Sequence, residues 1–128
     1  MNTQTVINLL GRELKVEYSK LASKQLSNLP EIVNLEMELQ FSCMIKKRVF
    51  QSMKGLSDNA VKLNENMFLS FKPITTNVCA PKDVDIHNHE SIEIFDIENP
   101  ERFVPNWLLI DYQKGEWCGE FGYDKATR

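Results

Sequence analysis

The feature that most constrains the fold is a run of strict alternation between Leu35 and Ile45. Apolar residues stand at every second position, and the residues between them are polar except for Met44. In a β-strand successive side chains point to opposite faces, whereas a helix would scatter this apolar set around its axis. We therefore predict a long, half-buried, antiparallel strand whose wet face carries Glu36 and Glu38. Such a strand needs partners on both edges or one edge that is protected.

The first segment, from Thr3 to Ser27, shows a different spacing that indicates an amphipathic helix. Apolar residues follow intervals of three and four: Ile7, Leu10, Leu14, Tyr18 and Leu21. Thr3 can cap the start of this helix and Pro30 follows its end. Gly11 is unfavourable inside a helix, and it marks either a break or a place of close packing.

Further strands are expected after the central one. Met67 to Lys72 alternates before Pro73, Glu90 to Ile97 contains two apolar positions of one parity, and residues 74–88 read as a long loop. Residues 49–66 are ambiguous between helix and strand. The segments 107–112 and 117–123 flank Gln113-Lys114-Gly115-Glu116, a pattern typical of a β-hairpin.

These elements together predict one α+β domain over residues 1–128. The apolar stripe of the N-terminal helix would pack on a curved, mostly antiparallel sheet of four to six strands, which removes both apolar surfaces from water. A chain of this length buries enough surface for a core of its own. No apolar run approaches the length of a membrane span, and the N-terminus lacks the pattern of a secretion signal, so we expect a cytoplasmic protein.

The cysteines and the basic cluster favour ordinary structural roles. Cys43, Cys79 and Cys118 are too dispersed for a disulfide framework and are expected to be free thiols. A catalytic Cys118 would need a neighbouring base, and the sequence offers none nearby. Lys46-Lys47-Arg48 contains no interleaved aromatic residue, so a solvated or edge-protecting role is favoured over nucleic-acid binding.

The distribution of charge is more informative than the net charge of −3. Residues 1–54 are net basic and residues 55–128 are net acidic, with most acids in one run: Asp83, Asp85, Glu90, Glu93, Asp96, Glu98 and Glu101. An acidic surface repels phosphate, so direct nucleic-acid binding is not expected there and a basic protein is the better partner. The alternative is that these acids only solvate a loop and an exposed strand face.

Both histidines fall in the same region as the acids. His87 and His89 share the parity of Asp83 and Asp85, so an extended segment would offer two imidazoles and carboxylates to one metal ion. Two histidines so close together also arise by chance, and they are weak candidates for a metal site. Phosphate-binding glycine loops, dinucleotide fingerprints and serine nucleophile elbows are absent from the sequence. We expect no cofactor and no enzymatic activity.

Aromatic residues near the acids suggest a protein-binding surface. Trp107, Tyr112, Trp117 and Tyr123 are many for a core of this size, although each one singly is more often buried. The predicted partner-binding residues are Asp83, Asp85, Glu90, Glu93, Asp96, Glu98, Trp107 and Tyr112.

In length, acidity and its acid-rich stretch from Asp83 to Glu101, the chain resembles the small bacterial immunity proteins of contact-dependent competition systems. The resemblance implies an inhibitor that binds a cognate nuclease-type toxin domain tightly and catalyses nothing. Two alternatives stay open. One is a phage or mobile-element inhibitor of a host nuclease complex, and the other is a small metal-binding domain or enzyme using His87 and His89.

Overall fold

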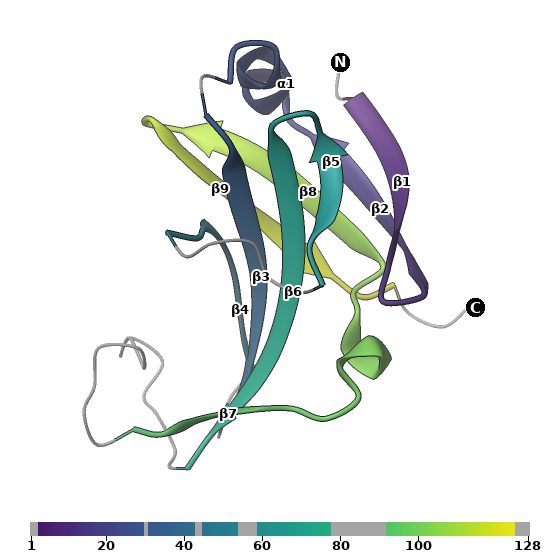
Figure 1. Cartoon of the computed structure of the whole chain (residues 1–128), viewed down its shortest axis with the longest axis vertical. Helices are drawn as coiled ribbons and strands as arrows, with labels where there is room; N and C mark the ends of the chain where they lie inside the picture. The colour runs from purple at the N-terminus through teal and green to yellow at the C-terminus, as the bar shows by residue number, and fades with distance from the viewer. Residues whose placement is uncertain (1–2, 30, 43–44, 54–58, 78–91, 125–128) are drawn as a thin grey trace.

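The computed structural model describes residues 3–29, 31–42, 45–53, 59–77 and 92–124, and these form two β-sheets with one short α-helix (Figure 1). The strands are β1 (Thr3–Leu9), β2 (Arg12–Tyr18), β3 (Val33–Phe41), β4 (Ile45–Gln51), β5 (Val61–Asn64), β6 (Met67–Thr76), β7 (Ile94–Asp96), β8 (Trp107–Gln113) and β9 (Glu116–Gly122). The helix α1 spans Lys20–Leu26, and the 3₁₀ turn η2 spans Pro100–Phe103. No helix in the described ranges has the length and apolarity needed to cross a lipid bilayer.

The first sheet, which we call sheet A, joins the two ends of the chain. Its strand order is β1-β2-β8-β9. The hairpins β1-β2 and β8-β9 are antiparallel, and they are joined by parallel pairing of β2 with β8, which places Lys15 beside Trp107. Residues about ninety positions apart in the sequence therefore lie side by side.

The second sheet, sheet B, is built from the middle of the chain. Its order is β4-β3-β6-β5, with β7 paired to the far end of β6. The central strands β3 and β6 run parallel over their full length, from Val33 beside Met67 to Phe41 beside Thr75. Figure 1 shows β8 and β9 passing obliquely behind β3 and β6.

One apolar core lies between the two sheets. Sheet A contributes Leu14, Val16, Leu108, Ile110 and Phe121, all at or below 1% exposure. Sheet B contributes Leu35, Met37, Met67, Leu69 and Phe71. The rings of Phe71 and Phe121 meet edge to face across the two sheets, with centroids 6.3 Å apart. Burial of these two apolar sheet faces is the main stabilising contribution to the fold.

The prediction of an α+β fold with a helix from Thr3 to Ser27 is wrong. That segment is the hairpin β1-β2 followed by α1, and the protein is mostly β with two mixed sheets. The break is at Leu10-Gly11, where both residues have positive φ (52° and 82°) and form the two-residue turn. Two-residue hairpin turns require this backbone, and a leucine at the first position concealed the signal. Leu14, Val16 and Tyr18 fit a period of two, while Leu10, Leu14 and Tyr18 fit a period of four.

The predicted strand over residues 35–45 is confirmed only to Phe41. The chain turns after β3, and Ile45 begins β4, so the alternation continued across a hairpin rather than along one strand. β3 pairs antiparallel with β4 but parallel with β6. The face of β3 that was predicted to be solvent-exposed is also partly buried, since Glu38 is 1% and Gln40 5% exposed.

Two other boundaries differ from the prediction. Pro73 does not end its strand: β6 continues to Thr76, and the carbonyl of Pro73 accepts a hydrogen bond from Ile97 N at 3.3 Å. The ambiguous region contains the end of β4 and the strand β5. The C-terminal hairpin is confirmed, with Lys114 (φ 52°) and Gly115 (φ 80°) forming its turn.

Candidate protein-binding surface

The outer face of sheet A combines apolar and acidic side chains, and we consider it as the candidate site. Leu14, Val16 and Tyr18 of β2 point into the core, so the residues between them point away from it. The strand registers extend this outer face across the sheet. One row runs Val6, Lys15, Trp107, Gly122, and the next runs Gln4, Glu17, Leu109, Glu120.

The centre of this face is apolar and half-buried. Trp107 lies over Gly122, since a Cβ on Gly122 would come within 2.5 Å of Cζ2 and 2.7 Å of Cε2 of the indole. The missing side chain lets the ring lie close to strand β9. Leu109 is on the same face two residues along β8 and is also half-buried, while Val6 is 55% exposed. A flat tryptophan beside aliphatic side chains is a typical anchor of a protein interface.

Acidic side chains share this face with the apolar centre. Their residues are Glu13, Glu17, Asp111, Glu116 and Glu120, and among the described strand residues of this face Lys15 is the one base. We call this set, together with Val6, Trp107 and Leu109, the acidic face. Glu13, Glu116 and Glu120 are exposed. The surplus of negative charge favours a positively charged partner.

Asp111 is held in place by the start of α1. Ser19 Oγ donates to Asp111 Oδ1 at 2.6 Å and accepts from Ala22 N at 3.1 Å, so the helix cap and the carboxylate are linked. Tyr112 N and Gln113 Nε2 also donate to the carboxylate. These hydrogen bonds, that of Ser19 first, lower the pKa of Asp111 below its ordinary value. Asp111 is therefore charged at neutral pH.

Cys118 lies opposite Asp111 on the same face and is half-buried. Burial, and then the charges of Asp111 and Glu116, raise the pKa of the thiol. The thiol is therefore protonated at neutral pH, which is the reverse of what a nucleophilic cysteine requires.

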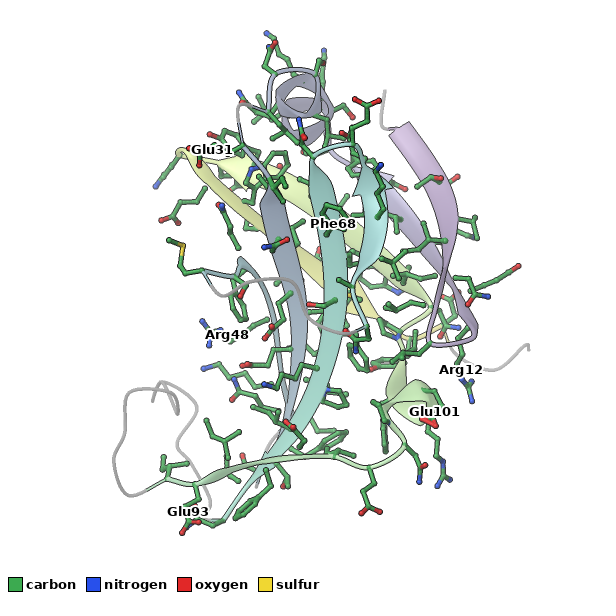
Figure 2. All side chains as sticks on the ribbon, viewed as in Figure 1. Arg12, Glu31, Arg48, Phe68, Glu93 and Glu101 are labelled. Atoms are coloured by element: carbon green, nitrogen blue, oxygen red, sulfur yellow. The ribbon has the colours of Figure 1, made fainter. Side chains whose placement is uncertain are left out.

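The acids predicted from sequence lie elsewhere. Glu93, Asp96 and Glu98 are exposed on β7 and beside it, and Figure 2 shows Glu93 at the end of the molecule remote from α1. Asp96 Oδ1 is 3.9 Å from Lys72 Nζ, and because both side chains are exposed this ion pair is weak. Asp83, Asp85, His87, His89 and Glu90 lie outside the described residues.

The two aromatic residues that were predicted to bind a partner, Trp107 and Tyr112, lie on opposite faces of β8. Trp107 is on the acidic face. Tyr112 has the parity of the core residues Leu108 and Ile110, and its ring meets that of Trp117 edge to face at 4.9 Å. The structure thus joins Trp107 to acids that the sequence reasoning missed, among them Glu13, Glu17 and Glu120. Their alternation with core residues was the available signal, and the helical interpretation of residues 3–27 concealed it.

The outer face of sheet B has a different character. Lys46 and Arg48 point outward from β4, and Lys72 points outward from β6. The Arg48 guanidinium lies 4.7 Å from the centroid of the Phe50 ring. Arg48 Nη1 is also 3.7 Å from Glu38 Oε1, which accepts a hydrogen bond from Gln40 Nε2 at 2.6 Å. The two outer faces therefore differ in charge, and only that of sheet A is dominated by acids among the described residues.

Comparison of the chain with protein-family models, curated proteins and solved structures gave no significant match.

Proposed function

We propose that this protein is a non-enzymatic inhibitor that binds a basic protein partner, as immunity proteins bind nuclease-type toxin domains. The observation that carries the proposal is the half-buried pair Trp107 and Leu109, which lies on a sheet face that also carries five acids. An apolar centre with a charged rim is the usual anatomy of a protein interface.

The chemistry of a nuclease explains why such a surface would inhibit it. A nuclease domain holds nucleic acid in a basic groove, because lysine and arginine neutralise phosphates. Carboxylates at Glu13, Glu17 and Glu120 can occupy the same groove and exclude the substrate. Opposite charges also accelerate the encounter, which matters when a toxin must be captured before it acts.

The exposed acids of β7 form a second region in this proposal. Glu93, Asp96 and Glu98 carry the same charge as the acidic face but lie on β7 of sheet B or beside it, so we treat them as a separate candidate region. The proposal places the protein in the cytoplasm, where an inhibitor of this class meets an incoming toxin.

The first step is to identify a nuclease-type domain among the products of the genes adjacent to this one, and the test uses that domain in purified form. Its nuclease activity and its affinity by calorimetry are measured with two variants of equal charge change. E13K/E17K/E120K alters the acidic face, and E93K/D96K/E98K alters the β7 region. We expect the first triple variant to lose inhibition by at least about 100-fold, since each opposed charge costs on the order of 1 kcal/mol or more. The second is expected to keep most of it.

Two controls make the result decisive. Circular dichroism and thermal unfolding must show that both variants are folded, which is expected because the changed side chains are largely exposed. W107A should weaken binding without changing its salt dependence, since it removes an apolar contact. Loss of inhibition in the β7 variant alone would assign binding to β7 instead, and a wild-type protein that leaves the toxin active would refute the proposed function.

A further inference from the structure

Strand β1 lies at the edge of sheet A with one side unpaired by any other described strand. Thr3–Leu9 pairs with β2 over its full length, and β1 is the last strand in the sheet order. Figure 1 shows β1 at the margin of the molecule. An edge of this kind presents backbone N–H and C=O groups that can pair with another strand.

The sequence of β1 contains none of the features that usually protect such an edge. Thr-Gln-Thr-Val-Ile-Asn-Leu has no charge, no proline and no glycine, and its register is uninterrupted. The other edges of the described sheets are protected. β4 and β9 lie beside each other and cover one another, β5 has a register shift and Lys62, and β7 has only three residues and carries Asp96. β1 is the exception, so we expect its open edge to pair with another strand when the protein functions.

The turn determines which residues face the open side. Leu9 and Arg12 flank the two-residue turn and form the first pair of the hairpin, which in such turns is a hydrogen-bonded pair. Leu9, Ile7 and Thr5 therefore direct their backbone groups to β2. Gln4, Val6 and Asn8 direct theirs outward, and the Val6 side chain is 55% exposed.

We propose that a second copy of this chain pairs with β1, antiparallel and centred on Val6. In this register Val6 lies opposite Val6 of the partner subunit, and Gln4 lies opposite the partner subunit's Asn8. The two four-stranded sheets then form one continuous sheet, and the two acidic faces lie on the same side of it.

The composition of the strand favours this occupant over a strand of another protein. β1 has no charged residue that would select a charged strand of another protein. Pairing of β1 with a second copy of itself places uncharged residues opposite each other over its whole length, so no like charges meet. The interface is small, so the dimer is expected to be weak and to depend on concentration. The inference does not require the proposed function, and its central residue Val6 lies at the border of the acidic face.

Disulfide trapping tests the register. Antiparallel hydrogen-bonded pairs have Cα atoms about 5.5 Å apart, within the range of a disulfide. V6C should therefore yield a covalent dimer on mild oxidation, in excess of any formed by the wild type through its native cysteines. Q4C alone should not, because its two copies would be separated by about 14 Å along the strands. Q4C mixed with N8C should yield the heterodimer. Equal crosslinking of V6C and Q4C would overturn the register.

Sedimentation velocity across a concentration series tests the dimer itself. Wild type should shift from monomer to dimer as concentration rises, and V6K should remain monomeric because it opposes two lysines at the centre of symmetry. I45K is the matched control, since Ile45 is 64% exposed and lies on β4 at the edge of the other sheet. It should dimerise like wild type. A wild type that stays monomeric throughout, with V6C forming no more crosslinked dimer than wild type, would overturn the proposal.

Discussion

The indole of Trp107 rests on Gly122, the residue directly opposite it in the β8-β9 ladder. A tryptophan can lie flat at this position because its cross-strand neighbour has no side chain. This pair contributes to the apolar centre of the acidic face. Strands β8 and β9 also approach closely at Gly119, which lies opposite Ile110, because a Cβ there would collide with the backbone carbonyl oxygen of Leu109.

G122A should therefore destabilise the protein by about 1–3 kcal/mol, because the added methyl must displace the ring or the strand. Urea unfolding followed by tryptophan fluorescence measures the change. The same substitution in a W107A background should cost clearly less, since the obstructing ring is gone. An equal cost in both backgrounds would show that the ring is not the obstacle.

S19A should remove the side-chain cap of α1 and the hydrogen bond from Ser19 Oγ to the Asp111 carboxylate. Loss of the cap costs about 1 kcal/mol. The pKa of Asp111 should rise toward its ordinary value of 3.8, because the strongest hydrogen bond to the carboxylate is removed. In the wild type this depressed pKa stabilises the fold above pH 3.8, and the contribution is lost as pH falls through the folded-state value. Carboxyl chemical shifts followed by NMR during titration give the pKa directly, and an unchanged value in S19A would contradict the assigned cause.

The protein should lose stability between about pH 10 and 12. Burial raises the pKa of Tyr18 and of Tyr123 from 10.0 to about 12. The neutral phenols therefore stabilise the fold below pH 10, and this contribution disappears as pH rises through the folded-state values. Tyr123 also donates its hydroxyl to the carbonyl of Phe103. Y123F should reduce the slope of stability against pH in this range, as measured by urea unfolding at several pH values. A slope identical to wild type would exclude Tyr123 as a contributor.

R48M should destabilise the protein by about 1–3 kcal/mol, because it removes the guanidinium that lies beside the buried carboxylate of Glu38. The pair is long at 3.7 Å and Arg48 is 32% exposed, which argues for the lower part of this range. The double variant E38Q/R48M should recover part of the loss, since a neutral amide can keep the contact with Gln40. Additive single-variant costs in the double-mutant cycle would show that the two charges do not interact.

The sequence predicted the parts of the fold whose strands and turns carry their usual residues. The hairpin around Lys114-Gly115 has glycine at the second turn position, and the sequence pattern predicts it correctly. The pattern does not predict the equally tight turn at Leu10-Gly11, because a leucine with positive φ is uncommon and because Leu10, Leu14 and Tyr18 also fit the spacing of a helix. The parallel pairing of β2 with β8 joins residues from opposite ends of the chain, and no local pattern encodes it.

The same reason explains the outcome for the candidate surface. Acidity and Trp107 were recognised from the sequence, but the acids that accompany Trp107 come from β2 and β9, and the sheet register alone brings them together. The sequence does not show that Trp107 and Tyr112 lie on opposite faces of β8, because that depends on the direction of each side chain in the folded sheet.

The placement of β8 between β2 and β9 also has a consequence for biosynthesis. The ribosome delivers the hairpin β1-β2 before β8, and the residues of β8 that pair with β2 follow it by about ninety positions. The edge of β2 that receives β8 therefore stays without this partner until about ninety further residues have been translated, and sheet A can be completed only after that point.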